Sequence, residues 1–225
     1  MECQCIAHII TDFDTKFGVP RQAGLVPALE GRIVFEPAYR VPEALRGLEG
    51  FSHLWLIWQF SEVPTDRQWS PTVRPPRLGG NVRMGVFATR SPFRPNPIGL
   101  SSVEISRIEY ATPEGPVIYV KGADLMNGTP ILDIKPYLPF TDCHPDARGG
   151  YTDQTRQQQP LDIVITDECR AAYPFSDSQW EVLRQVLSQD PRPHYQHDEM
   201  RTYGFSFAGT EVHFTVSGNT LTLCL

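Results

Sequence analysis

In residues 1–140 the hydrophobic positions come in short runs or alternate with polar ones, and glycines and prolines separate the runs. Alternation with a period of two is typical of β-strands, and frequent turns between strands are typical of a barrel or a sandwich. Only residues 41–50, VPEALRGLEG, predict a short helix in this half. We therefore expect a mainly β fold and not a doubly wound sheet. The predicted strands are 5–10, 32–36, 53–60, 83–88, 100–110 and 117–124.

Two of these strands carry further information. In VEISRIEY (103–110), Val103, Ile105, Ile108 and Tyr110 nearly alternate, with one break that is typical of a β-bulge. HLWLIWQF (53–60) is apolar at successive positions, as in a strand that is covered on both faces.

The pattern changes after residue 140. Residues 141–160 are polar, contain Gly-Gly and show no apolar period, so they predict a linker or long loop between a domain of residues 1–140 and one of residues 161–225. In the latter, Ser178 with Glu181 predicts a capping box, and Trp180, Leu183 and Leu187 share one helical face. Three alternating segments then predict a three-stranded meander. The C-terminal part is therefore expected to be a small α+β domain.

Charge is distributed unevenly along the chain. The net charge of the 225 residues is −6, but residues 67–103 contain six arginines and no acidic residue or lysine, which leaves −12 on the remainder. Guanidinium groups bind phosphate oxygens through paired hydrogen bonds, so this arginine window predicts an anion site. Arginines of a solvated loop that pair with carboxylates elsewhere would give the same composition, and both interpretations stay open. The arginines are Arg67, Arg74, Arg77, Arg83, Arg90 and Arg94.

The N-terminal sequence MECQCIAHII has no basic segment followed by a long apolar stretch, and the longest apolar run, LWLIW at 54–58, is too short to cross a bilayer. We therefore expect a cytoplasmic protein. The five cysteines are an odd, mostly isolated set that predicts neither a disulfide framework nor a zinc pattern. Cys3-x-Cys5 could bind a metal, but we expect reduced thiols and no metal.

The most distinctive loop is GVFATRSPFRPNPIGLSSVEI, 85–105. Pro92, Pro95 and Pro97 each remove an amide donor and bias the preceding residue towards extended geometry, so the loop cannot be helical. A loop that proline has already restricted loses little entropy when it binds a ligand. It would present Arg90 and Arg94 in fixed directions, as a preorganised small-molecule site requires, although a purely structural turn could have the same sequence.

Three other stretches could carry chemistry. GADLMNGTPILDIKPYLPF (122–140) has a strong Asn-Gly turn signal followed by Asp133, Lys135 and Tyr137, which fits a hairpin with a salt bridge equally well. KFGVPRQAGLV (16–26) and QDPRPHYQ (189–196) both place an arginine beside proline, and the second adds the aromatic Tyr195. Either could be an ordinary surface loop.

Several familiar catalytic patterns are missing from the sequence. No Gly-x-Gly-x-x-Gly follows a predicted strand, and no Walker loop, His-Glu-x-x-His or Gly-x-Ser-x-Gly elbow is present. The six histidines are scattered, and His53 beside LWLIW is best interpreted as a core residue.

Taken together, several stretches closely resemble the TrmO-type tRNA methyltransferases, also called the TsaA-like family. The resemblance covers nearly the whole chain, including the C-terminal part. The stretches are VPRQ (19–22), GLEGFSHLW (47–55), RPPRLGG (74–80), GVFATRSPFRPNPIGLS (85–101), DLMNGTPILDIKPYLPF (124–140) and QDPRP (189–193).

The resemblance implies a homodimeric enzyme that uses S-adenosyl-L-methionine (SAM) and has a single-sheet β-barrel catalytic domain. It also implies the substrate, tRNA bearing N6-threonylcarbamoyladenosine next to the anticodon, which is methylated at N6. One departure is Asn127, where many relatives have Asp. The implied SAM contacts are Pro20, Arg21, Gln22, Ser61, Glu62, Arg90, Leu100, Asp124, Leu125, Met126, Asn127, Gly128 and Thr129.

Methyl transfer to a urea-like nitrogen needs a base or donors for the developing anion, because the nitrogen lone pair is delocalised. Asp124 or Asp133 could supply a carboxylate, and Tyr137 a stacking or hydrogen-bonding group. We take Asp133 and Tyr137 as the catalytic candidates. RNA contacts are predicted for Arg74, Arg77, Arg94, Lys135 and Arg192. The alternatives are a non-catalytic RNA-binding module and a SAM-dependent enzyme acting on another substrate.

Overall fold

The computed structural model describes residues 3–64, 68–78, 81–155, 159–192 and 198–225. Arg67 and Tyr195, both singled out in the sequence, lie outside the described residues, as does the side chain of Arg77.

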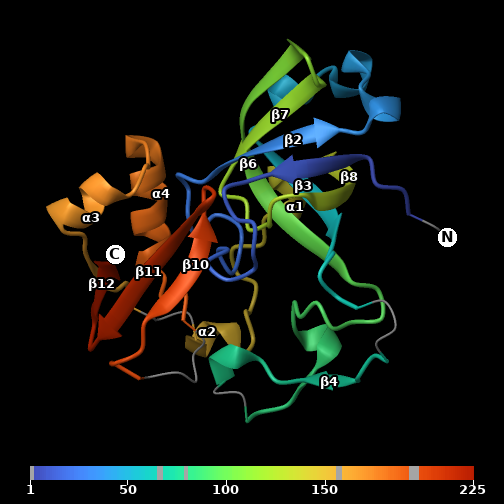
Figure 1. The fold of residues 1–225 in the computed structure, drawn as a ribbon. Helices are drawn as coiled ribbons and strands as arrows, with labels where there is room; N and C mark the ends of the chain where they lie inside the picture. Colours follow the sequence, from blue (N-terminus) through green and yellow to red (C-terminus); the bar gives the residue numbers. More distant parts are fainter. Residues whose placement is uncertain (1–2, 65–67, 79–80, 156–158, 193–197) are drawn as a thin grey trace.

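Six antiparallel strands close a barrel in the order β1-β2-β7-β6-β3-β8 (Figure 1). Leu54, Leu56 and Trp58 of one strand point into the barrel, where they pack with residues such as Val103 and Ile118. This every-second-residue burial follows from the two-residue period of a strand, and it confirms the predicted barrel. The strands are β1 Ala7–Ile10, β2 Glu30–Phe35, β3 His53–Gln59, β6 Ile98–Thr112, β7 Gly115–Lys121 and β8 Thr129–Pro136.

One strand prediction was wrong, and one barrel strand was missed. Residues 83–88 form only the two-residue strand β5 Met84–Gly85 and the 3-10 turn Val86–Ala88, because here the chain has left the barrel. Strand β8 was not predicted, because Pro130 and Pro136 at its two ends disguise it. The predicted bulge is confirmed, since the register of β6 against β7 shifts between Ile105 and Arg107. The predicted helix at 41–50 is two 3-10 turns, Pro42–Leu45 and Leu48–Gly50.

Between β3 and β6, the described residues from Phe60 to Pro97 form an excursion that projects from the barrel (Figure 1, lower right). Strand β4, Thr72–Val73, pairs with β5 inside it, and the 3-10 turn Pro76–Leu78 lies between them. The amide of Phe60 donates to the carbonyl of Pro97 at 2.8 Å, so the two stems of the excursion are joined where they leave the barrel.

The C-terminal part is a four-stranded sheet with two helices on one side (Figure 1). The predicted meander is confirmed, and a parallel strand, β9, extends it to the order β10-β11-β12-β9. The helix begins two residues earlier than the predicted capping box: Ser176 accepts from the amide of Gln179, whose side chain accepts from the amide of Ser176. The predicted linker, residues 141–160, is not without structure. The short helix α1, Pro139–Asp142, ends within its first residues, and α2, Thr152–Thr155, lies inside it. The remaining elements are β9 Asp162–Val164, α3 Asp167–Ala172, α4 Asp177–Ser188, β10 Tyr203–Phe207, β11 Thr210–Ser217 and β12 Thr220–Cys224.

The segment between β1 and β2 belongs to the C-terminal core although the barrel strands flank it. Phe13, Val26 and Leu29 are buried with the side chains of α4 and the second sheet, not with those of the barrel. Gly18 adopts a φ of +94°, and a Cβ there would lie 2.4 Å from the ring of Phe205. The segment is therefore held by both halves of the molecule.

All five cysteines are free thiols. Among the described residues, no helix has the length and apolar character that crossing a bilayer would require.

Candidate functional site

A chain of hydrogen bonds crosses the barrel end at which β3 finishes and β6 begins. The indole Nε1 of Trp58 donates to the hydroxyl of Ser101 at 3.0 Å, and that hydroxyl donates to Asp124 Oδ1 at 2.5 Å. An indole N–H can only donate, so Ser101 must accept from it and direct its own proton to the carboxylate. This fixes the orientation of Asp124, which follows β7.

Gly99 makes this arrangement possible. It lies opposite Trp58 in the β3–β6 register, and a Cβ at this position would lie 2.2 Å from the indole ring. Any larger residue would push the indole away from Ser101. The glycine of the Ile-Gly-Leu-Ser sequence therefore has a steric role in the site.

Asp124 is partly buried, and its pKa is raised. Desolvation by burial is the largest cause and disfavours the charged form. The hydroxyl of Ser101, the backbone amides of Asp124 and Ala23, and the charge of Arg90 act in the opposite direction but do not outweigh burial. The group is thus a carboxylate with more affinity for a proton than an exposed aspartate.

Arg90 and Gln22 approach the same end from two other segments. The Arg90 guanidinium donates to Gln22 Oε1 at 2.6 Å, and its charge acts on Asp124. Because the amide of Ala23 also bonds Asp124, the loop before β2, the proline-rich loop before β6 and the turn after β7 converge here. Three of the stretches singled out in the sequence are brought together.

The turn after β7 is bonded along its length to the end of β1. Thr11 Oγ1 donates to the carbonyl of Leu125, and the amide of Gly128 donates to the carbonyl of Ile9. The hydroxyl of Thr129 closes the turn by donating to the carbonyl of Met126 at 2.8 Å. Gly128 has a φ of +74°, which explains the Asn-Gly signal.

Asn127 uses both ends of its side-chain amide in this turn. Its Oδ1 accepts from the amide of Thr11 at 3.3 Å, and its Nδ2 donates to Asp14 Oδ1 at 2.9 Å. An aspartate at 127 could not donate to Asp14 and would repel it. The exchange of Asp for Asn therefore fits the local partner of this chain.

Pro20 and Arg21 are directed elsewhere. Arg21 Nη2 donates to the carbonyls of Asp190 and Arg192, at 2.8 and 3.0 Å, after the end of α4. Pro20 and Arg21 also line a cavity of about 130 Å³ against that helix. This volume is below the range of about 300–1,000 Å³ that is usual for small-molecule pockets.

Three of the predicted site residues, Leu100, Asp133 and Lys135, lie on the outer wall of the barrel. Ile57 is opposite Leu100 on one side and Asp133 on the other, so these side chains form a row facing away from the inward-pointing Trp58. Asp133 Oδ2 makes an exposed 2.8 Å ion pair with Lys135 Nζ. Within one chain, the barrel wall therefore separates Asp133 from the Asp124 cluster.

Tyr137 lies still further from that cluster. Its amide donates to the carbonyl of His53 at 3.0 Å, at the start of β3, and its ring contacts those of His53 and Trp55. Ser61 and Glu62, by contrast, form an exposed turn just after the end of β3, beside the excursion.

Among the arginines predicted to contact RNA, two have intramolecular roles. Arg94 Nη1 donates to the carbonyl of Thr89 at 3.0 Å and so braces its own loop. The Arg192 side chain is only 11% exposed and donates through Nε and Nη2 to Asp190, at 2.8 and 2.9 Å. Arg74 is exposed on the excursion.

Sequence reasoning gave no role to Ser101, although it ends the family-like stretch 85–101, or to Trp58 of the predicted strand 53–60. It also missed an aromatic pair on the excursion. Trp69 and Phe87 are 53% and 73% exposed, with ring centroids 6.4 Å apart. Neither is explained by packing. Their position within the arginine window was the available signal.

Comparisons with known proteins are consistent across sequence and structure. The profile of the tRNA-methyltransferase O N-terminal domain matches residues 8–143, and that of the TrmO C-terminal domain matches residues 158–224. The tRNA (adenine(37)-N6)-methyltransferase of Escherichia coli (strain K12) is 43% identical, over 86% of this chain and 83% of its own. That of Eikenella corrodens is 47% identical, over 74% and 91%. The crystal structure of TrmO from Pseudomonas aeruginosa superposes with a TM-score of 0.75 at 30% identity, covering 100% of this chain and 97% of that one.

Proposed function

This chain belongs to the TrmO family of tRNA methyltransferases, and from that premise we propose that the Asp124 end of the barrel is its active site. Its activity is SAM-dependent methylation of N6 of adenosine 37 in tRNA. We propose further that the acceptor is the N6-threonylcarbamoyl form of that adenosine. The observation that carries the assignment of the site is the convergence of Gln22, Arg90 and Asp124 from three separate segments.

SAM would be held by the residues around this convergence. When bound, it supplies an electrophilic methyl group on a positively charged sulfur. The Arg90 guanidinium can bind the carboxylate of an amino acid moiety, and Gln22 orients that guanidinium. Backbone groups of the turn 124–129 offer further contacts, because the turn is fixed against β1 and loses little entropy on binding.

Asp124 is the better candidate for the group that accepts the N6 proton. Its raised pKa makes it a stronger base than an exposed aspartate, and Ser101 holds it in one orientation. Asp133, in contrast, is paired with Lys135 on the exposed outer wall. Tyr137 is packed against His53 and Trp55, so we assign it a structural role in the single chain.

The RNA would approach over the excursion. The excursion leaves the barrel at the Asp124 end, carries Arg74 and Arg83, and exposes the rings of Trp69 and Phe87. Arginines neutralise phosphates, whereas aromatic rings stack on unpaired bases such as those of an anticodon loop. Lys135 lies on the outer wall and could contact a second part of the tRNA or the threonyl carboxylate.

A homodimer would complete the site. Ile98 and Leu100 are 41% and 50% exposed on the outer face of β6, next to Ile57 of β3. A second copy on this face would bury these apolar side chains and bring another wall to the predicted SAM contact Leu100. Because the substrate is tRNA, we place the enzyme in the cytoplasm.

A methyl-transfer assay tests the proposal. Purified full-length protein is incubated with radiolabelled SAM and tRNA that carries or lacks threonylcarbamoyladenosine. We expect methylation of the modified tRNA alone, and loss of both activity and calorimetric SAM binding in Arg90→Ala. The matched control is Arg32→Ala, since Arg32 is also half-exposed but pairs with Glu114 on the barrel surface.

Other outcomes would point to other functions. Binding of tRNA without SAM binding would indicate a non-catalytic RNA-binding module. Binding of SAM without methylation of either tRNA would indicate a different acceptor. Unchanged SAM affinity in Arg90→Ala would remove the assignment of the Asp124 end as the cofactor site.

A further inference from the structure

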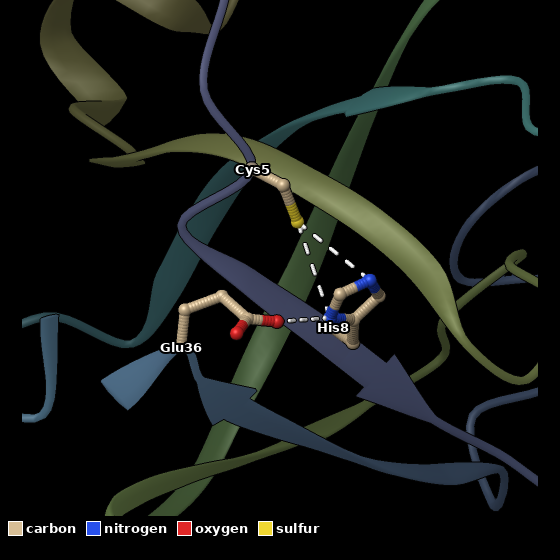
Figure 2. Close-up of side chains that lie close together, drawn as sticks. All are labelled: Cys5, His8 and Glu36. Carbon is tan, nitrogen blue, oxygen red and sulfur yellow. Dashed lines mark hydrogen bonds and ion pairs between the residues drawn. The ribbon is translucent and has the colours of Figure 1, made fainter. Parts of the chain in front are cut away.

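A cysteine, a histidine and a glutamate meet on the outer surface of the barrel, as Figure 2 shows. His8 Nδ1 lies 2.8 Å from Glu36 Oε1, and the Cys5 sulfur lies 3.9 Å from Nδ1 and 3.7 Å from Nε2 of the same ring. One donor atom from each residue lies within 4.8 Å of the other two. All three side chains are partly exposed, so an ion in solution can reach them.

The pairing of β1 with β2 creates this cluster. Ala7 is opposite Phe35, and the amide of Glu36 donates to the carbonyl of Ile6 at 2.9 Å, so Glu36 sits beside the start of β1. Ala7 and Ile9 point into the barrel, which directs His8 outward. The cluster lies where β1 begins, whereas the turn after Asp124 is bonded to the residues where β1 ends. It is therefore separate from the proposed active site.

We propose that Cys5, His8 and Glu36 form a Zn²⁺ site. Thiolate, imidazole and carboxylate are the three ligand types that zinc takes in proteins, and their combination is not typical of Mg²⁺ or Ca²⁺, which require oxygen. Zinc bond lengths of about 2.0–2.3 Å place tetrahedral ligands about 3.3–3.8 Å apart. The observed separations bracket this spacing. Three protein ligands leave the fourth position to water.

Accommodating the ion requires small movements of the side chains. His8 Nδ1 is the ring nitrogen that contacts Glu36, so it is the one that would bind zinc, and its contact with Glu36 must lengthen by roughly half an ångström from the hydrogen-bonded distance. The Cys5 sulfur lies at nearly the same distance from both ring nitrogens, so the ring must also turn to direct Nδ1 between the two other donors. The Glu36 side chain is 39% exposed and can adjust without disturbing the core. The His8–Glu36 ion pair alone adds little to stability, since both side chains are half-exposed and solvent screens the pair.

The ion would tie the segment before β1 to the end of β2. Because a metal that binds only the folded chain stabilises it by mass action, zinc should raise the melting temperature. The neighbouring Cys3 is not one of the three donors. It offers a second exposed thiol, two residues from Cys5, as a matched control.

Metal titration of the full chain tests the site. Chelator-treated protein is titrated with Zn²⁺ against a chromophoric competitor and, in parallel, with Co²⁺, whose thiolate charge-transfer band reports sulfur ligation. We expect one ion per chain, a cobalt–thiolate band that Cys5→Ser abolishes, and affinity lowered at least tenfold in Cys5→Ser, His8→Ala and Glu36→Gln. Cys3→Ser and Cys143→Ser should bind as the wild type does.

Several results would overturn the proposed zinc site. Fewer than one ion per chain, or affinity that His8→Ala and Glu36→Gln leave unchanged, would overturn the site, as would loss of binding in Cys3→Ser with retention in Cys5→Ser. Circular dichroism and SAM binding of each variant verify its fold. Because the cluster is remote from Asp124, both should stay unchanged.

Discussion

The Ser101 hydroxyl lies 2.5 Å from the Asp124 carboxylate and is held there by the indole of Trp58. Ser101 belongs to β6 and Asp124 to the turn after β7, so the bond also joins the barrel wall to this turn. Orientation of the carboxylate is thus built into the barrel and does not depend on a ligand. Replacing any one of Trp58, Ser101 and Asp124 should therefore disturb the hydrogen bonds of the other two.

Ser101→Ala should impair both activity and stability. The buried indole N–H of Trp58 would lose its partner, which costs about 1–3 kcal/mol, and Asp124 would lose a donor that favours its charged form. We expect a lower free energy of unfolding in urea and a reduced kcat with tRNA substrate. Ser102→Ala is the matched control, because Ser102 is opposite Trp55 on the other face of the strand. Equal effects of the two variants would contradict the assignment.

Asp124→Asn should change the pH dependence of stability in a defined direction. The raised pKa of Asp124 means that its contribution is fully present below the unfolded pKa of about 3.9 and is lost as the pH rises through the folded pKa. The variant lacks this titration. Its free energy of unfolding should therefore improve relative to the wild type between pH 4 and pH 7. A difference that stays constant or falls over this range would show that burial does not raise this pKa.

Trp69→Ala and Phe87→Ala should each weaken tRNA binding. Stacking of a base on an aromatic ring contributes about 1–3 kcal/mol, so affinity should fall roughly 5- to 150-fold. Both rings are largely exposed, and the unfolding midpoint and SAM affinity should hardly change. Phe140→Ala is a suitable control, since that ring is 87% exposed on α1, away from the excursion. Filter binding with modified tRNA makes the comparison. Normal affinity in both excursion variants would place the RNA elsewhere.

Arg192→Ala should lower the free energy of unfolding, because Arg192 pairs with Asp190 and its side chain is only 11% exposed. Burial alone would raise the pKa of Asp190, but the bonds and charge of Arg192 outweigh it, and the pKa is lowered. That stabilisation is present above the unfolded pKa of about 3.9 and is lost as the pH falls through the folded pKa. Removing the guanidinium leaves the partly buried carboxylate with only the amide of residue 192 and the charge of Arg21, which should cost about 2 kcal/mol at pH 7. The deficit should shrink in acid; a uniform deficit would argue for lost packing.

The barrel was predictable because its alternation reflects burial on one face of each strand. Strand β8 was not, because Pro130 lies near its start, where only the pairing with β1 reveals a strand. Strand alternation sets Leu100 and Ser101 on opposite faces, but which of them faces inward, and on which face Asp133 lies, depends on the register and on the irregularity between Ile57 and Trp58. No local pattern encodes that register.

The site was predictable in part. Resemblance brought the segments containing Gln22, Arg90 and Asp124 together, and the structure shows their contacts. Composition alone suggested only an anion site. The cluster of Cys5, His8 and Glu36 could not be found from spacing, because Glu36 joins it only through the pairing of β1 with β2.

Phe13, Val26 and Leu29 have a consequence for how this protein is made. They are synthesised before the side chains that cover them, which come from α4 and the strands β10, β11 and β12. Contacts so distant along the chain form slowly, and exposed aromatic and aliphatic groups promote aggregation meanwhile. During synthesis this segment therefore stays uncovered until the residues of α4 and of β10 to β12 have been made.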